Sequence, residues 1–597
     1  MKSIYALILS FLLMLLAVTW YFPRYNQSGS AAVIAWDVSG YYMYLPAIFI
    51  YHDLKYLNFE KKIVENYHHS DNSFQGAEQP NGGKVLQYTY GMAIVYLPFF
   101  FIANFLAEPL GYRADGFSIP YQFAIGFGSL LIALIGLFFL RKFLLRFFSD
   151  GATAITILAI AIGSNYFEYS SISGGLTHNY LFTLYAILLW YSIKFWEKPS
   201  VKFSLLIGLF AGLLTIIRPT EIISFIIPIL IGIKSWKELI ERIKFLFQKF
   251  LFFLSAIFPV LCFGFLQLYY WKYVSGHWLV YSYQDQVFDW FNPQINKGMF
   301  SYRAGWLIYT PIMIFSLVGY FFLYKLKKEI FWFSILFTIV FIYLCFAWSI
   351  WYYSGSFGIR AMVQSYAVLA IPFTAFNEWM IKRKWKLILF SSIMLFFTYY
   401  NIWLTHQAHK GGLLTIYGMT KSYFWKIFLR YDVPIETRYF LDCSERFDGE
   451  PKNNKTIFFT DFENDSLKYN QSVQPIDGEN SLYIDKTNSY FDICKISFPT
   501  EKYNWIRVSL MCSLKWKEYC DWNMTQLIIK LYDENNLELK KGKLLIQHVM
   551  NENETKTIHL DLKLPNENID SVHVFFFKGN SWQPVGIDNL KVEVFNE

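Results

Sequence analysis

The sequence predicts a polytopic α-helical membrane domain followed by a C-terminal all-β sandwich. Of its 597 residues, 55% are hydrophobic, 21% are aromatic and only 16% are charged, which is typical of membrane proteins. Apolar runs long enough to span a bilayer recur up to residue 405. From residue 456 onward, short alternating stretches separated by turn residues replace these runs, as expected of β-strands.

The first apolar run, Ile4 to Phe22, follows a short basic start and lacks a small-x-small cleavage site. We therefore expect an uncleaved first helix whose N-terminus lies in the cytoplasm. With the later runs, the sequence predicts about twelve transmembrane helices, in a range of about 11–13. The later runs lie at 88–107, 120–140, 152–170, 176–196, 203–217, 220–233, 250–271, 303–324, 331–350, 361–378 and 387–405.

The basic connectors orient these helices, because lysine and arginine are enriched in cytoplasmic loops. The net charge of +8 is therefore interpreted as an orientation signal and not as affinity for nucleic acid. Connectors 141–146, 234–249, 325–328 and 382–386 are expected in the cytoplasm, which places the loops 23–87, 272–302 and 351–360 and everything after His406 outside. Simple alternation puts 141–151 on the wrong side, so one early run must be split, re-entrant or miscounted.

The tail divides into a mixed connector, 410–455, and a sandwich of about nine strands, 456–597, after a membrane domain at 1–409. Its opening TDFE and closing GIDNLKVEVF resemble jelly-roll carbohydrate-binding modules. Such sandwiches also serve as inert caps. If the domain binds a saccharide, Trp516, Trp522 or Trp582 is expected to stack on the sugar, although each could equally lie in the core.

Metal and nucleotide sites are not predicted. The six cysteines form no C-x-x-C pair, the adjacent His68 and His69 read as a solvated loop, and neither Asp37 nor Asp53 belongs to an Asp-x-Asp pair. Disulfides among the tail cysteines stay open. No P-loop or Gly-x-Gly-x-x-Gly motif is present, which favours a lipid-linked donor over a nucleotide sugar.

The segment 31–51, AAVIAWDVSGYYMYLPAIFIY, holds a single charged residue, Asp37. A lone carboxylate in apolar surroundings near a bilayer is costly unless it is paired or used. A helix here would place Asp37, Tyr41 and Tyr44 on one face and lie at the membrane interface. We expect Asp37 to be the reaction centre, with helix capping as the alternative role.

Four short blocks carry a resemblance to a known family. They are WDVSGYYMYLP at 36–46, LLTIIRPT at 213–220, FSYRAGWLIYTP at 300–311 and WYYSGSFGIR at 351–360. Together with an acidic residue just after the first span, these blocks resemble the GT-C superfamily of integral-membrane glycosyltransferases, including uncharacterised members from the Bacteroidota. The resemblance covers the membrane part and none of the tail. It implies inverting transfer of a sugar from a polyprenyl-phosphate donor to a glycan, lipid or protein acceptor on the periplasmic face of a bacterial inner membrane.

Such a transfer needs a base for the incoming hydroxyl and cations for the phosphate. Asp37 is the expected base: burial would raise its pKa, and a nearby arginine would hold it ionised. Arg218, Arg303 and Arg360 are the expected phosphate ligands, because each lies at a span end outside the lysine clusters, and interfacial snorkelling is their alternative role. Further substrate contacts are expected from Tyr41, Tyr44, His178, Asn179, Asp285 and Tyr353.

The main alternatives to an enzyme are a transporter or flippase of a lipid-linked sugar and a cell-envelope assembly scaffold. Transporters tend to contain matching halves with broken helices, and no second copy of the large first loop is evident here. The sequence therefore favours the glycosyltransferase.

Overall fold

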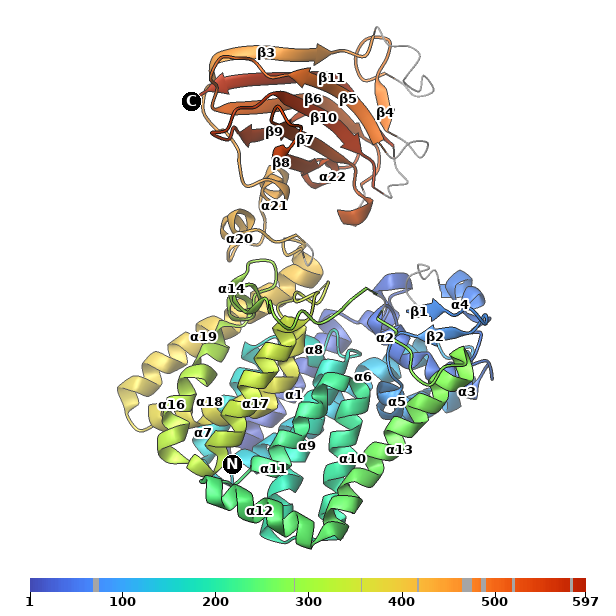
Figure 1. The fold of residues 1–597 in the computed structure, drawn as a ribbon, viewed down its shortest axis with the longest axis vertical. Coiled ribbons are helices and arrows are strands. Elements are labelled where there is room, and N and C mark those ends of the chain that lie inside the picture. Colours follow the sequence, from blue (N-terminus) through green and yellow to red (C-terminus); the bar gives the residue numbers. More distant parts are fainter. Residues whose placement is uncertain are drawn as a thin grey trace. The chain divides into compact units, whose positions relative to one another are not determined.

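The computed structural model describes all residues except 68–74, 284, 356, 416–417, 464–474, 485–489, 518–520 and 580–583. The chain divides into two compact units, Met1–Lys410 and Gly411–Glu597 (Figure 1). The first is a helical unit and the second contains antiparallel β-sheets. The predicted fold class, a helical membrane region followed by an all-β domain, is confirmed.

Within the described residues, five helices are long and apolar enough to cross a membrane, so the chain is a multi-pass membrane protein. Shorter apolar helices pack among them. The main helices are α1 (Lys2–Leu16, continued by a π-turn to Tyr21), α5 (Gly91–Ala107), α6 (Ile119–Leu144), α7 (Asp150–Gly163), α9 (Thr177–Glu197), α10 (Val201–Ile217), α11 (Ile226–Leu230), α13 (Phe250–Ser275), α16 (Ile314–Leu326), α17 (Lys328–Ala347), α18 (Tyr366–Met380) and α19 (Lys384–His406).

Two predicted runs are not continuous α-helices, and in each of them a proline starts a 3-10 segment. The run 220–233 consists of a 3-10 segment, Pro219–Phe225, followed by α11. The run 303–324 consists of α15 (Trp306–Tyr309), a 3-10 turn that starts at Pro311, and α16. Proline lacks the backbone N–H that would continue the ladder and restricts the residue before it.

The topological conflict at 141–146 is explained by α5. The N-terminal amine pairs with Asp150 at 2.8 Å, so the N-terminus and the 141–150 connector lie at the same end of the unit. Both ends of α5 lie at the other end. Just before the start of α5, the Thr89 hydroxyl donates a hydrogen bond to the Ile216 carbonyl at the end of α10. After the end of α5, the Tyr42 hydroxyl donates to the Gly116 carbonyl at 2.7 Å. The run 88–107 therefore forms a helix whose two ends both lie at the end of the unit opposite the N-terminus, so the run does not cross from one side to the other.

The segment around Asp37 forms two short helices, α2 (Asp37–Tyr42) and α3 (Tyr44–Phe49), separated at Met43. Every residue from Val38 to Ala47 is buried. The predicted interfacial helix is thus packed inside the protein, where neighbouring side chains fix it.

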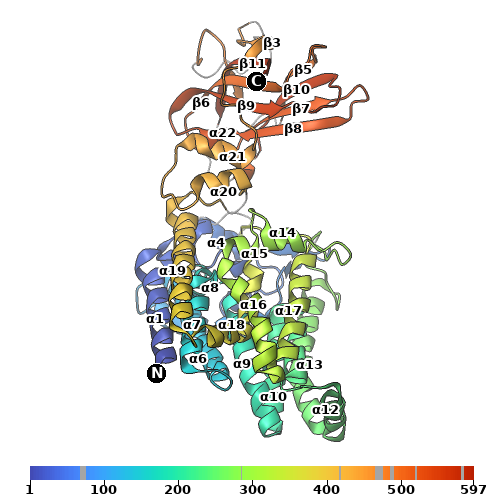
Figure 2. The same cartoon turned by 90° about the vertical axis from the view of Figure 1, so that its left-hand side faces the viewer.

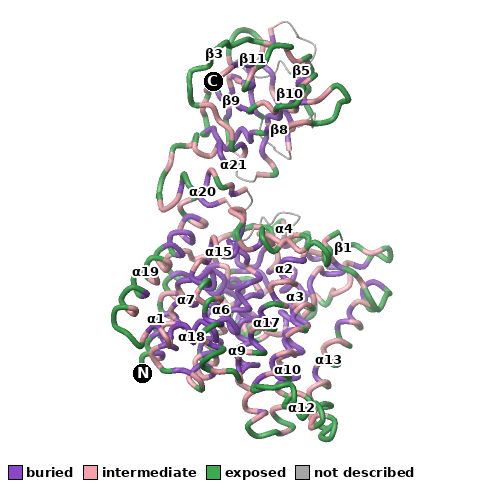
Figure 3. The backbone as a smooth tube through the Cα atoms, turned by 60° about the vertical axis from the view of Figure 1, so that its left-hand side comes forward, coloured by how far each residue is buried: buried purple, intermediate pink, exposed green. Residues whose placement is uncertain are grey.

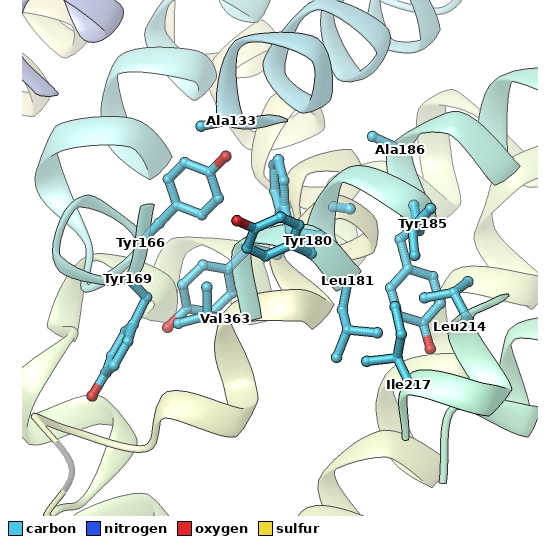
Figure 4. Close-up of a cluster of buried hydrophobic side chains, with 14 of the residues drawn as sticks. Ala133, Tyr166, Tyr169, Tyr180, Leu181, Tyr185, Ala186, Leu214, Ile217 and Val363 are labelled. Carbon is cyan, nitrogen blue, oxygen red and sulfur yellow. The ribbon is translucent and has the colours of Figure 1, made fainter. Parts of the chain in front are cut away.

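Aromatic side chains fill the centre of the helical unit. Tyr166 and Tyr180, from α8 (Tyr166–Ser170) and α9, are fully buried, and Tyr185 lies one turn further along α9 (Figure 4). Buried aromatics bring large apolar area together with a hydroxyl that needs a partner. This explains why tyrosine–carboxylate and tyrosine–amide hydrogen bonds recur near the site.

The C-terminal unit is a sandwich of two antiparallel sheets. One sheet has the order β5-β10-β7-β8, and the other β3-β11-β6-β9 with β4 paired to β11. Gly542 of β8 lies against Leu560 and Leu562 of β9, so the two sheets face each other. The strands are β3 (Lys452–Thr460), β4 (Leu482–Ile484), β5 (Tyr490–Ser497), β6 (Trp505–Leu514), β7 (Gln526–Tyr532), β8 (Glu538–Leu545), β9 (Glu554–Lys563), β10 (Ser571–Phe577) and β11 (Val585–Asn596).

The connector 410–455 packs on this sandwich, since the second unit begins at Gly411. Its helix α21 (Tyr439–Asp442) places Asp442 2.9 Å from His548, and the Tyr439 hydroxyl accepts from the Asp561 backbone N–H at 3.0 Å. The described cysteines form no disulfide. Cys520 lies outside the described residues.

Candidate functional site

The backbone before Asp37 adopts a rare conformation. Trp36 has φ 49°, a left-handed value that is unfavourable for a bulky residue. Two hydrogen bonds hold it: the Trp36 indole donates to the Ser30 carbonyl at 3.1 Å, and the Ser39 hydroxyl donates to the Trp36 carbonyl at 2.6 Å. Such strain persists only where the surroundings over-determine the geometry. Asp37 is thereby held at the start of α2.

Asp37 forms an ion pair with Arg360, which lies 323 positions later in the chain. The Arg360 Nη2 donates to Asp37 Oδ2 at 2.7 Å, and the Gln75 amide donates to Asp37 Oδ1 at 3.0 Å. The side chains of Asp37 and Arg360 are 19% and 16% exposed. Two of the predicted site residues therefore meet in a largely buried pair.

The charge state of Asp37 follows from these neighbours. Burial alone would raise the pKa of Asp37, but the Arg360 charge, the hydrogen bonds from Gln75 and Tyr88, and the Arg218 charge outweigh burial and lower it. Asp37 is therefore ionised at neutral pH. Both influences expected from the sequence act on this carboxylate, and the arginines dominate.

Tyrosine rings line the site on the Asp37 side. Tyr41 stacks on Tyr88 with ring centroids 4.0 Å apart, and Tyr283 meets Tyr88 edge-on at 5.9 Å. Tyr44 has a supporting role, because its hydroxyl donates its hydrogen bond to the Tyr88 backbone carbonyl at 2.6 Å. Tyr41 therefore lies at the site as expected, whereas Tyr44 positions Tyr88.

Arg218 and Arg303 lie over aromatic rings. The Arg218 guanidinium is 5.8 Å from the ring centre of Tyr353, and Arg303 is 3.4 Å from that of Tyr352. Among the described residues neither arginine forms an ion pair, and Arg303 Nε is buried without a hydrogen-bond partner. The Arg218 charge lowers the pKa of Asp37, whereas Arg303 contacts Tyr352, the residue next to Tyr353 in the chain. Both guanidinium groups keep donors for a further anion.

The loop that carries Arg360 is sharply bent. Tyr353 and Ser354 have φ 53° and 37°, and Gly358 has φ 62°. A Cβ on Gly358 would stand 3.0 Å from the Cβ of Tyr309, so glycine is required there for both conformation and space. This bend positions the Arg360 side chain next to Asp37.

His178 belongs to a buried polar chain. The carboxylate of Glu221 accepts from the Gln364 amide at 2.9 Å and from the Tyr185 hydroxyl. The Gln364 carbonyl oxygen consequently faces His178 Nδ1, 2.8 Å away, and accepts a hydrogen bond from its N–H. His178 Nδ1 therefore carries a proton.

Two other predicted residues are not placed at the site. The Asn179 amide donates to the Ser129 carbonyl at 2.8 Å, and its oxygen accepts from the Tyr166 hydroxyl at 3.0 Å, which identifies a packing role. Asp285 is exposed and forms no hydrogen bond or ion pair with another described residue.

Sequence reasoning missed Gln75, Glu221 and Gln364. Glu221 had a usable signal, since a carboxylate inside an apolar run three residues after Arg218 needs a partner. Gln75 had none, because it lies in a long polar loop and only the fold brings it to Asp37.

In the described part of the chain, no three His, Cys, Asp or Glu side chains could together hold a metal ion. His68 and His69 lie outside the described residues.

The chain matches no protein-family model and no curated protein sequence. Among solved structures, it is similar to the oligosaccharyltransferase AglB from Archaeoglobus fulgidus, in complex with an inhibitory peptide and a dolichol-phosphate. The identity is 10% and the TM-score 0.38, over 71% of this chain and 57% of that chain. It is also similar to the arabinosyltransferase EmbB from Mycobacterium smegmatis, at 10% identity and TM-score 0.39, over 98% of this chain and 64% of that chain. The chain thus covers less than two thirds of either protein, and similarity of this degree carries no argument about function.

Proposed function

We propose that this protein is an integral-membrane glycosyltransferase that moves a sugar from a polyprenyl-phosphate donor to a hydroxyl group on a glycan, lipid or protein acceptor. The observation that supports it is the largely buried Asp37–Arg360 pair, which lies beside Arg218 and the rings of Tyr41 and Tyr88. This arrangement combines an ionised carboxylate, fixed cations and flat aromatic faces. Those are the groups that a hydroxyl nucleophile, a leaving phosphate and a sugar ring require.

In the proposed reaction, the acceptor oxygen attacks the anomeric carbon of the donor sugar, and the bond from that carbon to the phosphate oxygen breaks. The electron pair leaves with the phosphate, and the acceptor proton passes to the Asp37 carboxylate. Attack from the face opposite the phosphate inverts the anomeric centre. No metal enters the proposed mechanism.

The phosphate is assigned chiefly to Arg218 at the end of α10, with Arg303 as a second cation over Tyr352, the residue next to the Tyr353 that Arg218 contacts. Each guanidinium offers several donors in one plane that can grip two phosphate oxygens. Arg360 would bridge the two halves of the site, since one edge already holds Asp37 at 2.7 Å. His178 and Tyr353 line the same region and are assigned to the sugar or acceptor.

The remaining assignments concern the surroundings of the site. We place it at the periplasmic face of a bacterial inner membrane, with the C-terminal unit outside the cytoplasm. Trp516 and Trp522 are 53% and 44% exposed on that unit, and we assign them to contact with a glycan, whereas Trp582 lies outside the described residues.

The direct test measures binding of undecaprenyl phosphate to the full chain in nanodiscs. Arg218→Gln should weaken binding, whereas Arg383→Gln, a matched change at an exposed connector residue, should not. Equal affinity of the two variants would contradict the assigned phosphate site. A radiolabelled sugar transferred from the lipid donor by the wild-type chain would distinguish an enzyme from a transporter or scaffold.

A further inference from the structure

Helix α12 (Trp236–Gln248) joins α11 to α13 at the end of the helical unit opposite α2 (Figure 1), and Figure 2 shows it at the end of that unit away from α15. Its start is encoded locally. The Ser235 hydroxyl accepts from the Glu238 N–H at 3.3 Å, and the Glu238 carboxylate accepts from the Lys234 N–H at 2.8 Å. These reciprocal bonds satisfy backbone donors at the N-terminus, so α12 is a defined helix within the connector.

One side of α12 is anchored to the protein. The Arg242 guanidinium stacks 3.8 Å from the centre of the Trp196 ring and donates to the carbonyls of Ile229 and Ile231 at 3.0 and 2.6 Å. Phe245 packs on the same tryptophan at 5.9 Å. The orientation of the helix about its axis is therefore fixed.

The opposite side of α12 is apolar and uncovered. Trp236, Ile240, Ile243 and Phe247 recur at intervals of four, three and four residues and so share one face. Trp236 is 76% exposed and Phe247 is 75% exposed, and no residue of α12 is buried (Figure 3). Leaving such a stripe in water is unfavourable, because its apolar area stays hydrated.

The chain on both sides of α12 determines what covers this stripe. The apolar helix α11 ends at Leu230 and the membrane-spanning α13 begins at Phe250, so both ends of the connector are tied to the bilayer. An apolar groove of about 450 Å³ opens between α10 and the first half of α13. It is lined by Leu205, Leu251 and Phe258 among others, a surface suited to acyl chains.

The charges of the connector specify the lipid. Residues 234–249 contain five basic and two acidic side chains. Glu238 is engaged at the helix start and Arg242 with Trp196, which leaves Lys237 and Lys244 exposed at the edge of the apolar face. Lysines beside a buried apolar stripe favour anionic headgroups.

We propose that α12 is an interfacial helix that docks on an anionic lipid leaflet, on the face of the bilayer opposite the Asp37 site. Its apolar stripe enters the boundary between headgroups and acyl chains, while Lys237 and Lys244 contact lipid phosphates. This inference does not depend on the proposed glycosyl transfer.

The test uses the full chain with Cys262, the exposed cysteine of the described residues, replaced by serine, in phosphatidylcholine nanodiscs. A bimane fluorophore is attached at Phe247→Cys on the apolar face or at Glu241→Cys on the polar face as the matched control. We expect spin-labelled lipid to quench position 247 and aqueous iodide to quench position 241. Iodide quenching at 247 equal to that at 241 would overturn the proposal. So would protection of 247 from both quenchers, because a protein partner or a second copy would then cover the stripe.

The second arm tests the lipid charge. Spin-labelled phosphatidylglycerol should quench position 247 more than spin-labelled phosphatidylcholine does. Each substitution, Lys237→Gln or Lys244→Gln, should reduce this preference by up to about fivefold, since one lysine near an anionic surface has about that effect. Equal quenching by the two lipids in the wild-type connector would overturn the assignment to anionic lipid.

Discussion

Asp37→Asn tests the centre of the proposed mechanism. The amide keeps the shape of the carboxylate and can still accept one hydrogen bond, from Arg360 or Gln75, but it cannot take the acceptor proton. Loss of a general base lowers turnover by about 10²- to 10⁴-fold. We therefore expect sugar transfer to fall by that factor.

The same substitution should also affect stability. Removing one partner of a buried ion pair costs about 3–5 kcal/mol, and the partial exposure of Asp37 and Arg360 favours the lower end, about 3 kcal/mol. The asparagine oxygen retains part of the interaction, so the chain should still fold. Thermal unfolding of the purified variant checks that loss of activity is not loss of the protein.

The assay follows radiolabel from polyprenyl-phosphate-linked sugars into acceptor material in membrane vesicles. Glu65→Gln, an exposed carboxyl in the same external loop, is the matched control and should transfer normally. A folded Asp37→Asn chain with near-normal turnover would remove Asp37 from the base role. A variant with unchanged turnover but weaker donor binding would instead assign Asp37 to holding Arg360.

The pH profile supplies an independent check. Because the pKa of Asp37 is lowered, the carboxylate stays ionised at every pH at which an ordinary aspartate is ionised. It is protonated only as the pH falls through its lowered pKa. Wild-type transfer should therefore show no loss attributable to Asp37 between about pH 5 and 7. An acidic limb within that interval that disappears in Asp37→Asn would refute the ion-pair argument.

Two further predictions concern the phosphate site and the C-terminal unit. Arg218→Lys keeps the charge but loses the planar fork, so affinity for undecaprenyl phosphate should fall by about tenfold, the effect of one charge-assisted hydrogen bond; unchanged affinity in a titration would return Arg218 to a packing role. Residues 411–597 should melt above residues 456–597, because only the longer fragment retains the bond from Asp442 to His548. Burial disfavours the charged imidazole of His548, but its two aspartate partners raise its pKa from 6.5 to about 9. The stability from this charge is full below about pH 6.5 and is lost as the pH rises through about 9. The difference between the two melting temperatures should therefore narrow over this interval without vanishing, because other connector contacts such as that between Tyr439 and Asp561 persist; a constant difference in calorimetry would contradict this.

The sequence predicts the elements of this fold better than their arrangement. The strand pattern and the long apolar runs are local signals, and both the helical unit and the sandwich follow from them. The path of α5 does not follow from local signals, because an apolar helix of 17 residues has the same sequence pattern whether it crosses the membrane or keeps both ends on one side. Only the contacts near its two ends, at Ile216 and Gly116, show that both ends lie on the same side.

For the site, the sequence identifies residues whose presence is costly but not their partners. A lone Asp37 in an apolar segment and an arginine at a span end are each conspicuous because burial of an isolated charge is unfavourable. Their pairing across 323 positions depends on the bend at Gly358 and on the strained Trp36. Gln75, whose amide carries no such signal, becomes visible only through its bond to the carboxylate.

The pairing also changes how the arginines divide their work. Since Arg360 already neutralises Asp37, a phosphate at the same guanidinium would compete with the carboxylate for its donors. Arg218 and Arg303, which lie against tyrosine rings without an ion pair among the described residues, face no such competition. Phosphate that reached Arg360 would weaken its hold on Asp37 and make that carboxylate a stronger base. Donor binding and base activation would then be coupled through one guanidinium, with Arg218 supplying the charge that keeps the phosphate in place.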